Sequence, residues 1–160
     1  MELQKPTAMK SSSLARRYGR VYEQLQQLLK KPGNRLSRMA TVAAVLHHKM
    51  DHFFWTGFYL LDEGKLIAGP YQGPVACQLL EKDRGVCWAA INKRESLIVP
   101  DVHAFDGHIA CDSRSRSEIV VPLTDSKGEI AGVLDVDSKE LKAFGETDRQ
   151  GLEKILSLLE

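Results

Sequence analysis

The chain has 160 residues, 43% hydrophobic and 27% charged, a composition typical of one folded domain. Its formal net charge of +1 offers no overall field that would recruit nucleic acid or an anionic membrane. The polar N-terminus, which contains Pro6, lacks the apolar centre of a signal peptide, and no apolar run is long enough to span a membrane. We therefore expect a cytoplasmic protein whose thiols are kept reduced.

The apolar pattern predicts helices at both ends of the chain and strands between them. Apolar residues recur at helical spacing in the terminal segments, and short β-rich segments alternate with turn residues. The expected elements are, in chain order, a loose arm (1–13), helices (13–31 and 35–50), a hairpin (53–61 and 65–68), a loop (69–74), a strand (75–80), a helix (85–92), a strand (97–99), an irregular segment (101–117), a second hairpin (118–123 and 130–136) and a final helix capped by Thr147. We expect residues 14–160 to form one α+β domain around a mostly antiparallel sheet of about six strands.

Three cysteines, Cys77, Cys87 and Cys111, are the first candidates for chemistry. Their odd number and spacing match neither a static disulfide framework nor a zinc finger, and a transient catalytic disulfide stays open. Cys111 lies in the irregular segment between His108 and Arg114, and cationic neighbours of this kind can activate a thiolate. From these residues alone, Cys111 is either a redox nucleophile or a small buried apolar side chain.

Three carboxylates are predicted to lie near one another. Asp135 and Asp137 are two residues apart on one predicted strand, so both side chains project from the same face. Glu118 opens the partner strand of that hairpin and can approach them. A cluster of this kind is unfavourable unless a cation or a shared proton relieves the repulsion. The simpler alternative, for Asp137, is that it begins the turn after the strand.

Two sets of residues contain side chains of the kinds that bind metals. Asp101, His103, His108 and Cys111 can be drawn as a zinc set, and the carboxylates as a calcium or magnesium set. The spacing of the two histidines and the cysteine is not a common zinc signature. We therefore expect no bound metal.

Residues 101–112, followed by residues 117–123, resemble the core of the free methionine-(R)-sulfoxide reductases, which are small stand-alone GAF-domain enzymes. The resemblance covers about residues 18–159. Its further matching segments are 55–60, 69–73, 85–87, 132–137 and 144–145. The chain departs from the family pattern at Trp88, where a small residue is more common, and in the basic residues Arg114 and Arg116, which we expect at the rim of the site.

The resemblance implies a GAF fold, with N- and C-terminal helices packed on the sheet, and a thiol mechanism. It implies that Cys111 attacks the sulfur of free L-methionine (R)-S-oxide and that Cys77 then forms a disulfide with it. Thioredoxin or a similar dithiol would restore both thiols, with no bound cofactor. Cys87 would be an auxiliary catalytic thiol.

The resemblance also implies which side chains hold the substrate. The carboxylates would bind the free amino group and help to polarise or protonate the sulfoxide oxygen, and an aromatic wall would enclose the S-methyl group. The implied substrate-binding residues are Trp55, Tyr59, Tyr71, Glu118, Asp135 and Asp137.

The main alternative is a GAF module that binds a small ligand or senses redox state without turnover. Sensory modules usually carry an output domain, for which we expect no room in this chain. A chromophore-attachment Cys-His pair is also not expected, because Asp112 follows Cys111. We expect a monomer or a homodimer that binds neither nucleic acid nor membrane.

Overall fold

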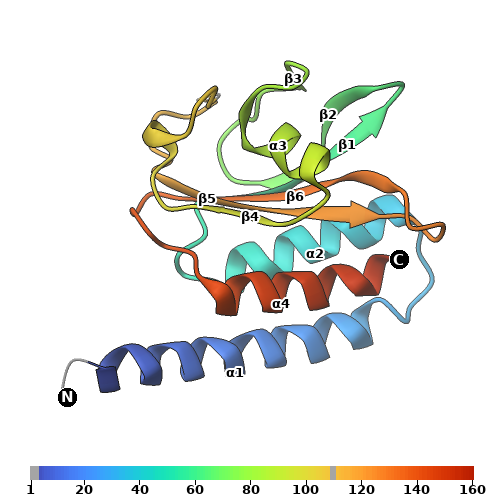
Figure 1. Ribbon diagram of the computed structural model, residues 1–160. Coiled ribbons are helices and arrows are strands. Elements are labelled where there is room, and N and C mark those ends of the chain that lie inside the picture. Colours follow the sequence, from blue (N-terminus) through green and yellow to red (C-terminus); the bar gives the residue numbers. More distant parts are fainter. Residues whose placement is uncertain (1–3, 109–110) are drawn as a thin grey trace.

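The computed structural model describes residues 4–108 and 111–160 and arranges them around one sheet (Figure 1). Within these residues the sheet has six strands in the order β3-β2-β1-β6-β5-β4, and all neighbouring strands are antiparallel. The strands are β1 (Trp55–Asp62), β2 (Lys65–Gln72), β3 (Leu79–Leu80), β4 (Leu97–Val99), β5 (Ser117–Thr124) and β6 (Ile130–Ser138). The helices are α1 (Gln4–Leu28), α2 (Arg35–Lys49), α3 (Gly85–Lys93) and α4 (Glu146–Leu156), with 3-10 turns η1 (Val102–Ala104) and η2 (Ser157–Leu159). The predicted α+β class is confirmed.

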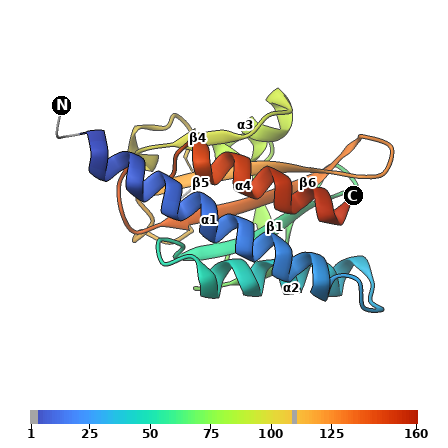
Figure 2. The same cartoon turned by 90° about the horizontal axis from the view of Figure 1, so that it is seen from below.

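The two faces of the sheet have different covers. Helices α2 and α4 lie against one face, and α1 forms an outer layer beyond them (Figure 1). Figure 2 shows α1 running obliquely across this helical layer. Helix α3 and the loops around it cover the opposite face (Figure 1). Across the described parts of the chain, no helix has the length and apolar character that spanning a membrane requires.

Side-chain alternation along each strand assigns residues to the two faces. In β6, Leu134 and Val136 point into the core between the sheet and the helices α2 and α4, and we call this side of the sheet the helical face. Asp135 and Asp137, on the same strand, point to the other side and line a cavity, and we call this side the cavity face. The register predicted from the hairpin sequence therefore places apolar and acidic side chains of one strand on opposite sides of the sheet.

The helical face carries the larger apolar core, to which α1, α2, α4 and strands β1, β5 and β6 contribute. Asp148, at the start of α4, is a buried polar group on the same side of the sheet. The Tyr18 hydroxyl of α1 donates to Asp148 Oδ1 at 2.6 Å, and the Gly145 amide donates to Oδ2 at 2.9 Å. His52 Nε2 lies 2.8 Å from Asp148 Oδ1. These contacts fix α1 to α4 and satisfy a carboxylate that burial alone would destabilise.

The two terminal helices begin earlier than predicted. Residues 4–13 are helical, which corrects the expected loose arm; residues 1–3 lie outside the described residues. Pro6 is compatible with this helix because the first-turn N–H groups have no intrahelical partner. Helix α4 is capped at Gly145 and not at Thr147, because Asp148 accepts the Gly145 amide. The extent of the single domain, residues 14–160, stays a prediction.

The segment around Cys77 also differs from its prediction. Residues 69–72, expected in a loop, continue β2, and Tyr71 and Gln72 pair with β1. Strand β3 pairs only with Leu66 and Ile67, so β2 is an edge strand beyond that point and tolerates Pro70. The strand expected over 75–80 shrinks to Leu79–Leu80, and Cys77 lies in the preceding loop. The irregular segment 101–117 was predicted, although its residues 109–110 lie outside the described residues.

Candidate active site

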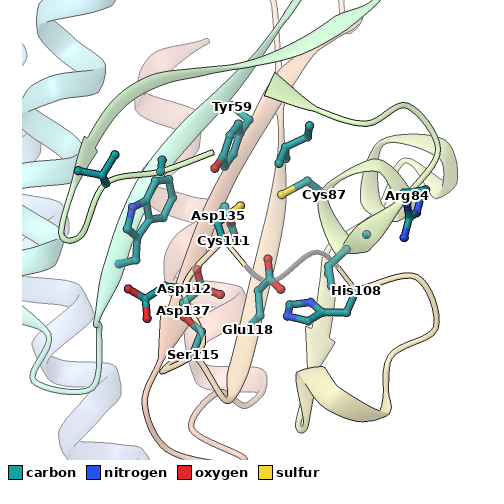
Figure 3. Close-up of a pocket in the computed structure, with 16 residues that line it drawn as sticks. Tyr59, Arg84, Cys87, His108, Cys111, Asp112, Ser115, Glu118, Asp135 and Asp137 are labelled. Atoms are coloured by element: carbon teal, nitrogen blue, oxygen red, sulfur yellow. The ribbon is translucent and has the colours of Figure 1, made fainter. Parts of the chain in front are cut away.

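A small cavity of about 50 Å³ lies on the cavity face of the sheet (Figure 3). Strands β1, β5 and β6 form one side of it, and the first turn of α3 forms another. The remaining lining residues are Val75, Ala76, Leu80, Arg84, His108, Cys111, Asp112 and Ser115. Two segments that are far apart in sequence, the loop before β3 and the irregular loop before β5, therefore meet at the same opening.

A disulfide joins Cys77 and Cys111 beside this cavity, with a Cα–Cα distance of 5.5 Å. Both cysteines lie in loops; Cys111 is exposed and Cys77 is half-buried. The pairing implied by the family resemblance is thus present in the structure. Because Cys111 is exposed, the reading of this residue as a small buried apolar side chain is wrong. The bond is open to attack by an incoming thiolate.

Glu118, Asp135 and Asp137 converge on the cavity, as predicted. Glu118 pairs directly with Asp137 across β5 and β6, and Asp135 lies two residues away on the same face. Glu118 and Asp135 are only 5% and 6% exposed. Strand β6 continues through Ser138, so Asp137 belongs to the strand and does not open a turn. Among the described residues, Asp135 Oδ1 has no hydrogen-bond partner.

The three carboxyl groups share an environment that favours protonation. Burial, reinforced by the charges of Asp135 and Asp137, raises the pKa of Glu118 well above its usual value. Burial and the charge of Asp135 likewise raise the pKa of Asp137, and burial raises the pKa of Asp135. A positive group entering the cavity would reverse this trend by stabilising the carboxylates. The cluster can therefore hold a cation or supply a proton.

Cys87 lies in the first turn of α3 and points into the same space as the carboxylates (Figure 3). Burial, followed by the charges of Asp135 and Glu118, raises the pKa of this thiol well above its usual value. It is free and buried, and its sulfur lies within 4.8 Å of a carboxylate oxygen of Asp135. A buried thiol of this kind is a weak nucleophile. Its neighbour Trp88 donates to the Leu80 carbonyl at 3.4 Å and packs into the core beside α3.

Stacked aromatic rings form the wall opposite α3. Trp55 and Tyr59 line the cavity, and their ring centroids are 5.7 Å apart at an interplanar angle of 22°. Tyr71 stacks on Trp55 at 5.3 Å but is not among the described cavity-lining residues, so it supports Trp55. Gly57 makes this stack possible: a Cβ there would lie 2.2 Å from Tyr71 Cβ and 2.6 Å from the Trp55 ring.

Polar residues of the rim were not predicted as lining residues. Arg84, Asp112 and Ser115 all line the cavity, and Figure 3 shows Arg84 at its far edge. Arg114 donates to both oxygens of Asp112, and these hydrogen bonds lower the pKa of Asp112 to about 2. Arg114 is thus a rim charge, as expected, and it is paired with an acid. The sequence feature that could have identified Asp112 as a lining residue is its position next to Cys111.

The zinc set drawn from the sequence is not gathered among the described residues. The Asp101 carboxylate accepts the His103 amide at 3.0 Å and caps η1. The His103 and His108 rings pack edge to face with centroids 6.4 Å apart, and Cys111 is disulfide-bonded. His108 does line the cavity, and burial together with His103 lowers its pKa.

The chain is similar to known proteins over most of its length. A GAF domain family model matches residues 39–160. GAF domain-containing protein A of Dictyostelium discoideum is 48% identical over 144 residues, which cover 89% of this chain and 90% of that protein. Free methionine-R-sulfoxide reductase of Escherichia coli is 44% identical over 125 residues, which cover 78% of this chain and 75% of that enzyme.

Solved structures agree with the sequence relatives. The structure of free methionine-R-sulfoxide reductase from Neisseria meningitidis, in complex with its substrate, is 42% identical with a TM-score of 0.85. The match covers 89% of this chain and 86% of that chain. The buried carboxylates, the paired cysteines and these similarities agree with one another, and the chain is a GAF-domain protein that belongs to the free methionine-(R)-sulfoxide reductase family.

Proposed function

We propose that this protein reduces free methionine (R)-S-oxide to methionine, with Cys111 as nucleophile and Cys77 as resolving thiol. The observation that carries the proposal is the Cys77–Cys111 disulfide beside a cavity that holds three carboxyl groups. The enzymes from Escherichia coli and Neisseria meningitidis, which carry this activity in their names, support it.

The carboxylates account for a preference for the free amino acid. Its ammonium group supplies a positive charge that would stabilise Glu118, Asp135 and Asp137 as carboxylates, and Asp135 Oδ1 has no hydrogen-bond partner among the described residues. A methionine sulfoxide inside a peptide chain has no ammonium group, so it would leave these carboxylates unpaired. A site built for a charged partner rejects analogues without it strongly.

The aromatic wall suits the other end of the substrate. Trp55 and Tyr59 present a flat apolar surface to the cavity, and Tyr71 holds Trp55 in place. The Trp55 indole nitrogen also donates to the Pro74 carbonyl at 3.0 Å, which fixes the ring orientation. We assign this wall to the S-methyl group, so that the sulfoxide sulfur faces Cys111.

The chemistry proceeds in three balanced steps. The Cys111 thiolate attacks the sulfoxide sulfur, a proton moves to the sulfoxide oxygen, and the oxygen ends on Cys111 as a sulfenic acid while methionine leaves. The Cys77 thiol then attacks the Cys111 sulfur, which forms the disulfide and releases water. Finally a thioredoxin-like dithiol exchanges with the disulfide, so that both thiols are restored and the reductant becomes oxidised. No bound cofactor is needed.

The carboxyl cluster supplies the proton of the first step. Burial raises the pKa of Glu118 and Asp137 and so favours their neutral form, and a neutral carboxyl can donate to the oxygen as it gains negative charge. The substrate ammonium simultaneously stabilises the remaining carboxylates. Burial and Asp135 raise the pKa of Tyr59, so its hydroxyl stays a neutral donor beside them.

Cys87 has a different role from the other two thiols. Its burial and raised pKa make it a poor partner for disulfide exchange. Its sulfur instead lies within 4.8 Å of one oxygen each of Glu118 and Asp135, so the side chain packs against both carboxyl groups. We therefore assign Cys87 to positioning and not to resolution.

The deciding experiment measures methionine formation from the separate R and S epimers of free methionine sulfoxide with dithiothreitol or thioredoxin. We expect turnover of the R epimer alone. Cys111→Ser should abolish it, whereas Cys77→Ser should release one equivalent of methionine and then stall under weak reductant. Cys87→Ser, the matched thiol control, should keep multiple turnovers. No methionine from the wild-type protein with either reductant would refute the proposal and favour a binding or sensing module.

The carboxylates are tested by a fourth variant. Glu118→Gln keeps the shape of the side chain but removes its charge and its proton, so we expect a large fall in kcat/KM. An unchanged kcat/KM would remove Glu118 from the site.

A further inference from the structure

We propose that Cys87, Glu118 and Asp135 form a binding site for a thiophilic divalent cation, Zn²⁺, at the inner end of the cavity. The ion would occupy the space assigned to the substrate ammonium. It would therefore act as an inhibitor that competes with substrate, and not as a cofactor. This set differs from the histidine-rich set considered from the sequence.

The three side chains come from three different elements and meet at one point. Cys87 lies on α3, Glu118 on β5 and Asp135 on β6. The Cys87 sulfur and one oxygen from each carboxylate all lie within 4.8 Å of one another, and all three residues are buried. Ligand atoms around tetrahedral zinc are about 3.3–3.6 Å apart, given its usual bond lengths. Side-chain adjustments of about 1 Å would close the set around an ion.

A second observation points to a ligand at this place. Asp135 is 94% buried, and its Oδ1 atom has no hydrogen-bond partner among the residues that the structure describes. Asp135 lines the cavity, so a group that enters can approach its carboxyl. An unpaired buried acceptor is unfavourable, and coordination to a cation would remove the penalty.

The sulfur decides which cation fits. Magnesium and calcium prefer sites made only of oxygen atoms, whereas zinc combines thiolate with carboxylate. Zinc binding would release the Cys87 proton to solvent and form a Zn–S bond, with no change in oxidation state. An ammonium group gains nothing comparable from the thiol. Three protein ligands would also leave a fourth position open toward the cavity, as in other accessible zinc sites.

The disulfide form of the protein provides a clean test. In that form Cys77 and Cys111 are bonded to each other, and Cys87 is the free cysteine. Titration of the oxidised full chain with ZnCl₂ by calorimetry should show one site. CdCl₂ should produce an ultraviolet thiolate-to-cadmium band, and MgCl₂ should produce neither signal. Free methionine sulfoxide should weaken the zinc affinity by competition.

Substitutions assign the ligands. Cys87→Ser, Glu118→Gln and Asp135→Asn should each weaken zinc binding at least tenfold. Asp112→Asn removes a carboxylate from the rim of the same cavity and should leave the affinity unchanged. Equal zinc affinity in Cys87→Ser and wild type would overturn the proposal. If that variant does not fold, the wild-type protein decides: absence of the cadmium band would overturn it as well.

The inhibitory consequence rests on the proposed reductase function, but the binding does not. Zinc binding at Cys87 in a protein without turnover would support this site and refute the reductase proposal. Turnover that Zn²⁺ does not inhibit, in a protein without the cadmium band, would do the reverse.

Discussion

The two faces of the sheet are built from the same strands, but one carries an apolar core and the other carries a cavity lined by carboxyl groups. On the helical face, Leu134 and Val136 join a continuous apolar core between the sheet and the helices α2 and α4. On the cavity face, Asp135 and Asp137 of the same strand sit close to Glu118 under the thinner cover of α3 and two loops. One face gains stability by excluding water, and the other retains buried acids that disfavour the ligand-free fold.

Neighbouring residues of one strand therefore serve different purposes: one stabilises the fold, and the next lines the candidate active site. A substitution on the helical face should lower the free energy of unfolding and leave the activity of the folded protein unchanged. A substitution of a cavity-face carboxylate should lower activity with little loss of stability. Proteins commonly store unfavourable groups where they act. Neighbouring positions of β6 make a direct comparison because their backbone environment is shared.

The largest expected effect on stability comes from Leu134→Ala. Leu134 is fully buried on the helical face, so the variant should lose about 2–5 kcal/mol in free energy of unfolding. Urea denaturation measures this loss. The folded fraction should retain its kcat/KM, whereas Asp135→Asn should lose activity with little loss of stability. The comparison between the faces breaks down if both substitutions affect stability alike.

The contact of α1 with α4 gives an intermediate effect. Tyr18→Phe removes the buried hydrogen bond to Asp148 and should lower the free energy of unfolding by about 1–3 kcal/mol. Tyr22→Phe is the matched control, because the Tyr22 hydroxyl has no hydrogen-bond partner among the described residues and its ring stays under Lys154. Equal stability of the two variants in urea would contradict a role for the Asp148 network.

The cavity face predicts the smallest of these changes, with a defined pH dependence. Since burial raises the folded-state pKa values of Glu118 and Asp137, the folded protein binds more protons than the unfolded chain between about pH 4.5 and those raised pKa values. Stability of the ligand-free protein should therefore fall as pH rises through these folded-state pKa values. Asp137→Asn should reduce this slope and should make the protein more stable than the wild type at pH 8. Urea unfolding at pH 5 and pH 8 tests it, and an unchanged slope would exclude Asp137 as a source.

Patterns with a short physical range were readable from the sequence. The spacing of Asp135 and Asp137 correctly placed both on one face, because strand side chains alternate regardless of the rest of the fold. The hairpin around residues 125–128 correctly brought Glu118 opposite them. The pairing of Cys77 with Cys111 came from family resemblance, since the residues alone left several pairings open.

Features that depend on distant contacts were not readable. The edge position of β2, which admits Pro70 into a strand, follows from β3 being only two residues long. Residues 4–13 offered a polar, proline-containing segment, and nothing local distinguished a loose arm from the helix that forms there. The place of Tyr71 behind Trp55 depends on the glycine at position 57 in the neighbouring strand. The buried state of Cys87 depends on how α3 docks against β5 and β6.

The Cys77–Cys111 bond has a consequence for the thermodynamics of the whole chain. The two cysteines are 34 positions apart, and the loop that they close contains α3 and β4. Closing a loop of this length restricts the unfolded chain by an amount equivalent to about 4 kcal/mol. The oxidised protein should accordingly be the more heat-resistant of its two forms. Its melting temperature would then report the redox state of the cysteines directly, without substrate and without a chemical label.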